Sequence, residues 1–302
     1  MSPCHRILIF GIVLAAVSGF FWAQQPPAKP APGQPAAMTV QNLKDGLYLV
    51  KAGSGANAGF FVGTQGVVVI DAKMTADAAR QMLEEIRKVT PLPVQTVLLT
   101  HSDGDHVNGL AGFPAGLDIV SSEGTRKEME EAFRDEKFAA LRAYLPTQVF
   151  SDRGTLRLGD TMIELLPFGP AHTSGDTVVF FPSQKIAFIG DLAFIGRDPL
   201  IHRQKGGTFF GYTGALRKML DLDADVYIGG HNDPLGKDDL RGLLASMEEK
   251  LAKVKALVAE GKTLDEVKKA FGIEDAVGAG GRRWPSLVEV IYLELTEKKD
   301  SP

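Results

Sequence analysis

The chain has 302 residues, with 33 Lys or Arg, 37 Asp or Glu and a formal net charge of −4 at pH 7. Its length allows one large domain or two small ones with a substantial core. The slightly negative charge and the lack of a basic run give no support to nucleic-acid binding, which depends on clustered Lys and Arg. We therefore expect a small-molecule substrate and no nucleic acid, and the sequence leaves the oligomeric state open.

Residues 1–23 have the pattern of a secretory signal peptide, because His5 and Arg6 precede an apolar run that is followed by small residues. The run is also near the lower length limit for a membrane span, so an N-terminal anchor is the alternative. Both interpretations predict a periplasmic or secreted protein, with no membrane association beyond that anchor. Cys4, the only cysteine, precedes the run, so cleavage would leave no disulfide, no Cys nucleophile and no Cys metal ligand.

Residues 24–37 are rich in Pro, Ala and Gln, a composition typical of a linker, and we expect one folded domain over residues 38–302. A glycine-rich turn near the start of that domain contains Asn57. Asn57 is a candidate substrate contact, and a plain hairpin turn is the alternative.

Apolar spacing predicts the secondary structure of this domain. In chain order, we expect strands at residues 46–52, 59–71 and 94–99, two strands within 148–168, and strands at 177–181 and 185–189. We expect helices at residues 75–89, 124–144, 213–220, 237–259, 263–271 and 286–295. Hairpins occur in both halves of the chain, mixed with helices, which favours two packed sheets covered by outer helices. The predicted fold class is therefore α/β (α+β by some schemes), a four-layer αββα sandwich of two mixed β-sheets.

Two histidines and two aspartates follow the expected strand at residues 94–99: His101, Asp103, Asp105 and His106. A glycine between the two aspartates allows a tight turn before a short helix. Imidazole and carboxylate groups bind divalent transition metals, so this cluster indicates half of a metal site. The alternative is an acidic loop that caps a helix.

Three further residues of the metal-ligand type stand at the ends of expected strands: His172, Asp191 and His231. Loops of layered α/β proteins converge at such strand ends on a rigid scaffold, and ligand groups collect there. The repetition of the pattern favours a common site over independent structural roles.

Residues 194–212 form a long segment that follows Asp191 directly, and loops of this length are commonly functional. We expect this segment to form a wall of the substrate pocket. Its candidate substrate contacts are His202, Arg203 and Tyr212, of which His202 and Arg203 would contact an anion. The alternative for each of them is an ordinary solvent-exposed loop residue.

Together these residues resemble the pattern of the metallo-β-lactamase-fold superfamily: His-x-His-x-Asp-His, then a lone His, a lone Asp and a lone His. The resemblance spans residues 38–295. It implies that one metal is bound by His101, Asp103 and His172, that a second is bound by Asp105, His106 and His231, and that Asp191 bridges the two. It also implies a catalytic role for Asp105, which would orient the attacking hydroxide, and a supporting role for Asp71 behind the metal loops.

Asp103 departs from that pattern, because the family has histidine at this position. An extra carboxylate offsets metal charge and makes iron or manganese more plausible than imidazole would. We expect one or two Zn²⁺ ions, with Fe or Mn as the alternative. Flavodiiron proteins of the same superfamily have Glu at the corresponding place and bind two irons.

The resulting prediction is an exported metal-dependent hydrolase that uses a mono- or dinuclear site to activate water against an ester, lactam or lactone-like bond. Two alternatives stand beside it on the sequence alone. One is an iron-dependent oxidoreductase of the same fold, acting in persulfide or oxygen chemistry. The other is a non-catalytic binding protein with a damaged site.

Overall fold

The structure of the protein, a computed structural model, describes residues 37–274 and 284–297, which belong to one compact unit. The predicted signal peptide or anchor (1–23), Cys4 and the predicted linker up to residue 36 lie outside the described residues. Among the described helices, none is both long enough and apolar enough to cross a membrane.

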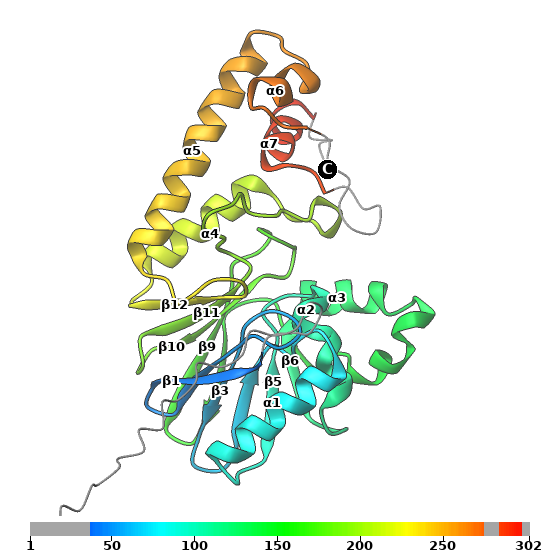
Figure 1. Cartoon of the computed structure of the whole chain (residues 1–302), viewed down its shortest axis with the longest axis vertical. Coiled ribbons are helices and arrows are strands. Elements are labelled where there is room, and N and C mark those ends of the chain that lie inside the picture. The colour runs from blue at the N-terminus through cyan, green and yellow to red at the C-terminus, as the bar shows by residue number, and fades with distance from the viewer. Residues whose placement is uncertain (1–36, 275–283, 298–302) are drawn as a thin grey trace, which may run out of the picture. The chain divides into compact units, whose positions relative to one another are not determined.

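Two β-sheets form the centre of the domain (Figure 1). The first sheet has seven strands that follow one another in chain order: β1 (Thr39–Lys44), β2 (Leu47–Lys51), β3 (Ala58–Val62), β4 (Val67–Ile70), β5 (Val94–Leu98), β6 (Asp118–Ser122) and β7 (Gln148–Phe150). Its first four strands are antiparallel, and β4 to β7 are parallel.

The second sheet has five strands in the order β12-β11-β10-β9-β8: β8 (Gly154–Leu158), β9 (Thr161–Pro167), β10 (Thr177–Phe181), β11 (Ile186–Gly190) and β12 (Val226–Gly229). The first four of these in the chain are antiparallel, and β12 pairs parallel with β11. Both sheets are therefore mixed, as the sequence predicts.

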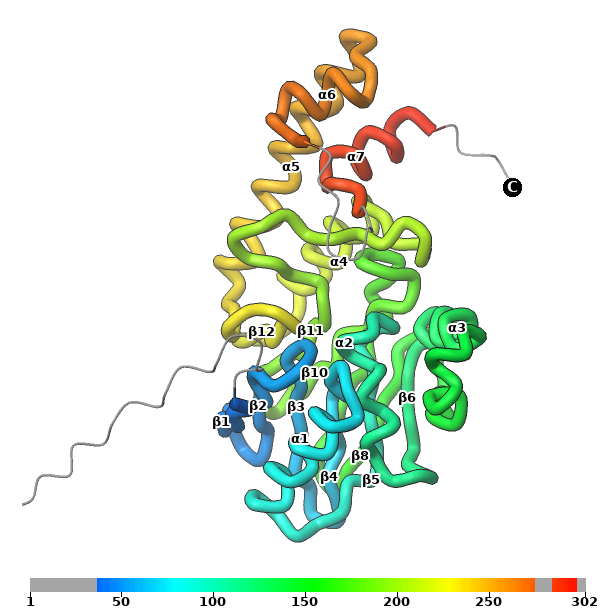
Figure 2. Tube along the Cα trace, turned by 45° about the vertical axis from the view of Figure 1, so that its right-hand side comes forward, coloured from blue at the N-terminus to red at the C-terminus, as the bar shows by residue number. Residues whose placement is uncertain are grey.

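Helices cover the outer faces of the two sheets. They are α1 (Ala76–Val89), α2 (Gly104–Val107), α3 (Glu123–Ala132), α4 (Phe209–Asp221), α5 (Lys237–Ala259), α6 (Leu264–Ala270) and α7 (Leu287–Thr296), with the 3₁₀ segments η1 (Asn108–Gly112), η2 (Glu136–Tyr144) and η3 (Arg203–Lys205). The helix α1 packs with η1, whereas α4 to α7 pack on one another. Figure 2 shows the same division, with α4 to α7 together beyond β11 and β12, and α1 beside β4 and β5.

Strand periodicity explains why the layers hold together. Successive side chains of a strand point to opposite faces. In β4, Val67 and Val69 therefore pack in a cluster with α1, whereas Val68 and Ile70 pack in the cluster between the two sheets. A third cluster joins the outer face of the second sheet to α4, α5 and α7. Three apolar clusters between four layers confirm the predicted αββα sandwich.

The predicted helices over residues 75–89 and 237–259 are confirmed within one residue as α1 and α5. The predicted helix over residues 124–144 is wrong as one element, because it divides into α3 and η2. The division has a local cause: the Asp135 side chain accepts a hydrogen bond from the Lys137 N–H and begins a new turn, while the guanidinium of Arg142 holds the carbonyl of Phe133.

The strand ends of the two sheets meet on one side of the sandwich. The backbone N–H of Thr177, at the start of β10, donates to the carbonyl of Thr100, which follows β5 in the other sheet. At the same place the parallel strands β11 and β12 end side by side at Gly190 and Gly229. The turns after β5, β9, β11 and β12 are thereby brought to one place.

Candidate metal centre

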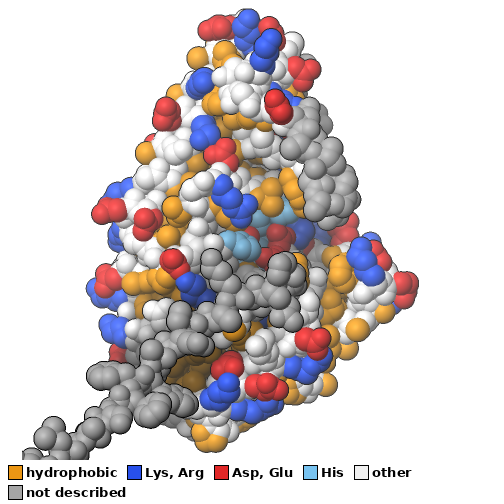
Figure 3. All heavy atoms as spheres, viewed as in Figure 1, with side chains coloured by type: hydrophobic (Ala, Val, Ile, Leu, Met, Phe, Trp, Pro, Cys, Tyr) orange, Lys and Arg blue, Asp and Glu red, His pale blue; other side chains and the backbone are white. Residues whose placement is uncertain are grey.

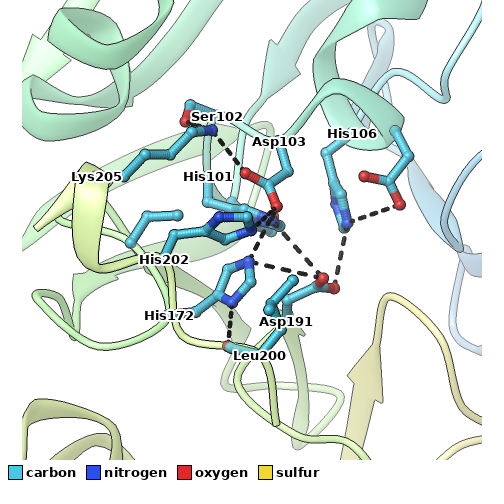
Figure 4. A network of polar contacts seen from close by, with 12 residues as sticks. His101, Ser102, Asp103, His106, His172, Asp191, Leu200, His202 and Lys205 are labelled. Atoms are coloured by element: carbon cyan, nitrogen blue, oxygen red, sulfur yellow. Dashed lines mark hydrogen bonds and ion pairs between the residues drawn. The ribbon is translucent and has the colours of Figure 1, made fainter. Parts of the chain in front are cut away.

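Four turns supply the seven residues that the sequence predicts as metal ligands. The turn after β5 carries His101 and Asp103 and continues into α2 with Asp105 and His106. His172 lies between β9 and β10, and Asp191 and His231 directly follow β11 and β12. Figure 4 shows the side chains of His101, Asp103, His106, His172 and Asp191 pointing toward one another. All seven predicted residues lie together.

The first cluster consists of His101, Asp103, His172 and Asp191, whose donor atoms all lie within 4.8 Å of one another. His172 Nε2 is 3.1 Å and His101 Nε2 is 3.9 Å from Asp103 Oδ2. The same two nitrogens are 3.8 Å and 4.0 Å from Asp191 Oδ2. These separations suit donors that share one ion, because zinc binds imidazole nitrogen and carboxylate oxygen at about 2.0–2.2 Å.

The second cluster consists of Asp105, His106 and His231. His231 Nε2 is 3.2 Å from Asp105 Oδ2 and 3.2 Å from Asp191 Oδ2. His106 Nε2 is 3.2 Å from the other oxygen, Asp191 Oδ1. Asp191 therefore faces both clusters, in the position expected of a bridging carboxylate.

The rings of the buried histidines are oriented from behind. The Nδ1 atom contacts the Thr100 hydroxyl at 3.0 Å in His101, the Asp71 carboxylate at 2.7 Å in His106, and the Leu200 carbonyl at 2.7 Å in His172. Contacts at Nδ1 leave Nε2 as the nitrogen that points into the site. Such outer partners fix the tautomer and the ring direction of metal-binding histidines.

The donor set fits divalent metal ions. Among the described residues, His101 Nε2, His106 Nε2 and Asp191 Oδ1 are buried atoms without a hydrogen-bond partner. Buried polar atoms without partners are rare and costly, and here three of them face the same small volume. Imidazole with carboxylate is a donor combination for zinc, iron and manganese. The residues present can therefore hold metal ions, and the geometry does not discriminate among these three.

The neighbouring carboxylates shift the pKa values of the imidazoles in the site. Hydrogen bonds with Asp105 and Asp191 raise the pKa of His231 to about 9. Burial lowers the pKa of His172, but Asp103 and Asp191 outweigh it and raise this pKa to about 9. For His101, burial and the neighbouring His106 hold the pKa well below 6.5. In the absence of metal, protons therefore occupy part of the nitrogen set at neutral pH.

Asp103, the departure from the family pattern, is held on both oxygens. Its Oδ1 accepts a hydrogen bond from Lys205 Nζ at 2.6 Å, and its Oδ2 lies 2.9 Å from His202 Nε2. Burial raises the pKa of Asp103, but the imidazoles of His172, His202 and His101 hold it well below its usual range. No local sequence pattern indicates this role for Lys205, because only the fold brings residue 205 to the turn after β5.

The predicted substrate contacts occupy different surroundings. His202 is 3% exposed and reaches the first cluster. Arg203 points elsewhere and pairs with Glu297, directly after α7, through its two terminal guanidinium nitrogens, at 3.1 Å and 2.5 Å. Tyr212 is fully buried in α4, and its hydroxyl donates to the backbone carbonyl of Asp191 at 3.0 Å. Tyr212 supports the Asp191 turn, so its prediction as an accessible pocket wall is corrected.

Asn57 also has a structural partner set. Its amide nitrogen donates to the carbonyls of Gly229 at 2.9 Å and Asn232 at 2.8 Å. These two carbonyls flank His231. Asn57 therefore fastens the glycine-rich turn of the first sheet to the ligand turn of the second.

The accessible side of the centre lies at the second cluster. The side chains of Asp105 and His231 are 23% and 33% exposed, whereas those of the first-cluster histidines are at most 1% exposed. Figure 3 shows histidine surface in a hollow of this face, beside acidic and hydrophobic side chains. The ring of Phe194 stacks on His231 with 5.7 Å between centroids and also lines a cleft of about 490 Å³ against α5.

Comparisons with known proteins agree with this geometry. A family model described as Metallo-beta-lactamase superfamily matches residues 52–231, more than half of the chain. The 2,4-dinitroanisole O-demethylase subunit alpha of Nocardioides sp. (strain JS1661) is 26% identical over 233 residues, which cover 76% of this chain and 64% of that protein. A linear primary-alkylsulfatase of Pseudomonas sp. (strain ATCC 19151) is 20% identical over 231 residues, or 62% of this chain and 44% of that protein. The chain thus spans less than two thirds of the length of either relative.

Solved structures show the same fold. A metallo-beta-lactamase from Pontibacter korlensis superposes with a TM-score of 0.60 at 19% identity, over 70% of this chain and 99% of that one. A stereoselective inverting sec-alkylsulfatase from Pseudomonas sp. superposes with a TM-score of 0.67 at 18% identity, over 86% of this chain and 50% of that one. With the family match and the seven converging side chains, these likenesses lead to one conclusion: the chain belongs to the metallo-beta-lactamase superfamily.

Proposed function

We propose that this protein is a metal-dependent hydrolase that binds two divalent ions, zinc in the first instance, and cleaves an ester, lactam or lactone-like bond in a small molecule. The observation that carries the proposal is the position of Asp191, whose carboxylate faces imidazole nitrogens of both clusters, with His101 Nε2 and His106 Nε2 buried without hydrogen-bond partners among the described residues. Two ions held a short distance apart are a recurring device for hydrolysis.

The first ion would be held by His101, His172 and Asp191 with Asp103, and the second by Asp105, His106, His231 and Asp191. Bound ions would supply water of increased acidity and stabilise the charge that develops on the substrate. The exposed side at Asp105 and His231 is where a substrate would enter. There the Asp105 carboxylate would orient the attacking water.

Phe194 would separate the substrate from bulk solvent. Its ring lies flat against His231 on one face, and the Arg197 guanidinium lies 4.2 Å above the ring centroid. The cleft lined by Phe194, Ile195 and Arg197 would take the part of the substrate that does not react. The lining mixes apolar side chains with two cations and three aspartates, so the cleft suits an apolar group and does not select the charge of the substrate.

The relatives support a broad activity class, since their names include an alkylsulfatase, a metallo-beta-lactamase and a hydroxyacylglutathione hydrolase. The identities of these three to the present chain are 20–28%, so none of their substrates transfers directly. We also propose export to the periplasm or medium, supported by the charged and apolar pattern of residues 1–23. N-terminal sequencing of protein recovered from its own compartment tests the export proposal.

The first experiment measures metal per chain by elemental analysis on protein purified without added metal. It continues with a panel of esters, lactams, lactones and sulfate esters, assayed before and after chelation and metal return. We expect close to two zinc ions per chain and hydrolysis that is lost on chelation. The Asp105→Asn variant should be inactive while it stays folded, and Asp233→Asn, at an exposed position, serves as its control.

Other outcomes would replace the proposal. Iron in place of zinc, together with no hydrolysis, would favour the oxidoreductase interpretation, since carboxylate at position 103 adds oxygen to the donor set. Absence of any bound metal after purification and after titration would overturn a catalytic role and favour a binding protein.

A further inference from the structure

A third imidazole reaches the first cluster from the segment between β11 and α4. His202 is 3% exposed, and its Nε2 lies 2.9 Å from Asp103 Oδ2. On that oxygen it joins His172 Nε2 at 3.1 Å and His101 Nε2 at 3.9 Å. Three imidazole nitrogens from three separate segments therefore surround one carboxylate oxygen.

The backbone builds this position. The N–H of His202 donates to the carbonyl of His172 at 2.8 Å, which places the two rings edge to face with centroids 4.7 Å apart. The carbonyl of His202 accepts from the N–H groups of Lys205 at 2.9 Å and Gly207 at 3.0 Å, which closes a tight turn. Trp284 packs edge-on against the other side of the ring, with centroids 4.5 Å apart. The ring direction is therefore set by packing and by main-chain contacts.

His202 also has a partner at Nδ1. The Gln204 side-chain amide nitrogen lies 3.3 Å from this atom, and an amide turned to present its oxygen would accept from Nδ1–H and free Nε2 to bind metal, as the oxygens of Thr100 and Asp71 do for His101 and His106. Its Nε2 is buried without a well-aligned hydrogen bond among the described residues, a property it shares with the Nε2 atoms of His101 and His106.

One oxygen of Asp103 is already paired with a lysine side chain. Its Oδ1 pairs with Lys205 Nζ at 2.6 Å, and the same ammonium donates to Ser102 Oγ at 2.8 Å. A cation on one oxygen withdraws charge from the carboxylate and leaves only Oδ2 facing the cluster. The position where the family has an imidazole is thus occupied here by a weakened, single-oxygen donor.

We propose that His202 Nε2 is a ligand of the first metal ion and supplies, from the segment after β11, the imidazole that the family pattern has at position 103. The ion would then have His101, His172 and His202 with Asp103 Oδ2, and Asp191 shared with the second ion. That set has three nitrogens and two oxygens, a mixed donor set that zinc can bind. The inference rests on the proposed metal-dependent function, and it is tested by metal binding and not by turnover.

The experiment uses the full chain stripped of metal and titrated with Zn²⁺ against a chromophoric chelator, and with Co²⁺ followed by visible absorption. The main variant is His202→Phe, which keeps a ring against Trp284 but removes the nitrogen. We expect one of the two ions to bind at least about tenfold more weakly, because one ligand is lost, with a changed Co²⁺ band for that ion alone. Arg217→Ala, in an exposed ion pair of α4, is the control for substitution as such.

A compensating variant makes the assignment specific. Asp103→His combined with His202→Phe returns the imidazole count to that of the natural chain, and we expect it to recover the lost affinity. Should His202→Phe fold poorly, the unaltered protein labelled with ¹⁵N-histidine gives the answer. With only six histidines in the chain, the His202 Nε2 resonance is expected to shift when zinc is added.

The outcomes separate the two proposals. Wild-type affinity for both ions and an unchanged Co²⁺ spectrum in His202→Phe would overturn the ligand assignment alone, and His202 would be a hydrogen-bond partner of Asp103. An Nε2 resonance that ignores zinc would do the same. Failure of the unaltered chain to bind any ion would overturn the proposed function as well.

Discussion

His106 Nδ1 lies 2.7 Å from Asp71 Oδ2, and the same carboxylate accepts hydrogen bonds from the N–H and the hydroxyl of Thr100 at 2.9 Å and 2.8 Å. Asp71 ends β4 with a left-handed backbone (φ 61°) and is 3% exposed. One buried carboxylate therefore fixes both the β5 turn and the ring of a predicted ligand.

Replacing Asp71 with Asn should weaken metal binding at the Asp105–His106–His231 cluster by about 10- to 100-fold, the usual cost of losing such a partner. The reason is that an amide cannot accept all three hydrogen bonds and carries no charge to hold the imidazole proton. Chelator-competition titration measures the effect. Asp77→Asn, at an exposed position of α1, is the control. Equal affinities in the two variants would contradict this role for Asp71.

Metal removal should lower the thermal stability of the protein. The predicted ligands come from turns of both sheets, so bound ions hold the two halves together in the folded state only. Stabilisation grows with free metal and reaches about 2.7 kcal/mol at a hundred times the Kd. Thermal unfolding with and without chelator measures it, and Asp191→Ala should abolish the dependence on added zinc. An unchanged midpoint after chelation would count against the site.

Zinc uptake should release protons and strengthen as pH rises from 6 to 9. In the metal-free protein the pKa values of His172 and His231 are about 9, so both nitrogens are protonated at pH 7 and must lose a proton to bind metal. Calorimetric titration in two buffers of different ionisation enthalpy counts these protons. The His231→Ala variant should release about one proton fewer on zinc binding. Affinity that is flat over this range would contradict the prediction.

His172 and His231 also affect the stability of the metal-free protein, which should fall as pH rises, whereas zinc affinity should increase. Their folded-state pKa lies above the ordinary value of 6.5, so they stabilise the fold fully below pH 6.5. That contribution is lost as pH rises through about 9. Unfolding of the chelated protein at pH 6 and at pH 9 checks this sign, and His231→Ala should reduce the difference.

Gly230 should tolerate no side chain. A Cβ atom there would lie 2.4 Å from Asp191 Oδ1 and 2.8 Å from His106 Cε1, so one of these groups must move. Gly230→Ala should therefore lose metal at both clusters. Gly214→Ala is the matched control, because its Cβ would meet no heavy atom within 4 Å and it lies inside α4. That change should stabilise the protein by about 0.5–1 kcal/mol. Retention of both metals in Gly230→Ala would refute the packing argument.

Lys73 is a buried cation that holds the backbone of the glycine-rich turn after β2. It is fully buried with a left-handed backbone (φ 68°), and its ammonium donates to the carbonyls of Ala52 at 2.8 Å and of Ala56. Lys73→Met would leave these acceptors without a donor, and we expect a loss of about 1–3 kcal/mol in the free energy of unfolding. Denaturant titration measures it, and Lys88→Met, on exposed α1, is the control.

The free energy of unfolding that Lys73→Met loses should depend on pH in a defined direction. Burial lowers the pKa of Lys73 from 10.5 to about 8, so between these values the unfolded chain holds a proton that the folded chain has released. Stability from this group therefore rises with pH across that window. The difference between the natural protein and Lys73→Met should be larger at pH 9.5 than at pH 7.5. The opposite order would show that Lys73 stays charged.

The sequence predicted the parts of the structure that depend on neighbouring residues. Apolar spacing located α1 and α5, and the turns after β5, β11 and β12 were found because a ligand-type residue directly follows an apolar run. The edge strand β1 has no such signal, since its side chains are all partly or fully exposed. It forms because β2 offers a partner.

The start of α4 shows what the sequence could not supply. The prediction began this helix at residue 213, but it begins at Phe209. Thr208 caps it by accepting from the Gly211 N–H, and Glu294 of α7 accepts from the N–H groups of Phe209 and Phe210 at 2.6 Å and 3.4 Å. A partner 85 residues away is invisible to local pattern.

In the candidate site, too, some residues could be predicted from local sequence and others only from the fold. The seven predicted ligands stand on strand ends and could be found one by one, whereas the orientations of His202 and Lys205 depend on a main-chain bond to His172 and on Asp103. The sequence predicted His202 as a candidate anion contact in a long segment and gave no signal that it faces the first cluster. Its direction became visible once two sheets had been packed together.

The pairing of Arg203 with Glu297, which follows α7, and of Glu294 in α7 with the start of α4, ties the segment that carries His202 to α7. A small shift of α7 would then be transmitted as a displacement of an imidazole, although α7 contributes none of the proposed ligands. The chemistry of the centre can therefore diverge between related proteins through substitutions in the helical layer, while the strand-end residues that hold the ions stay the same.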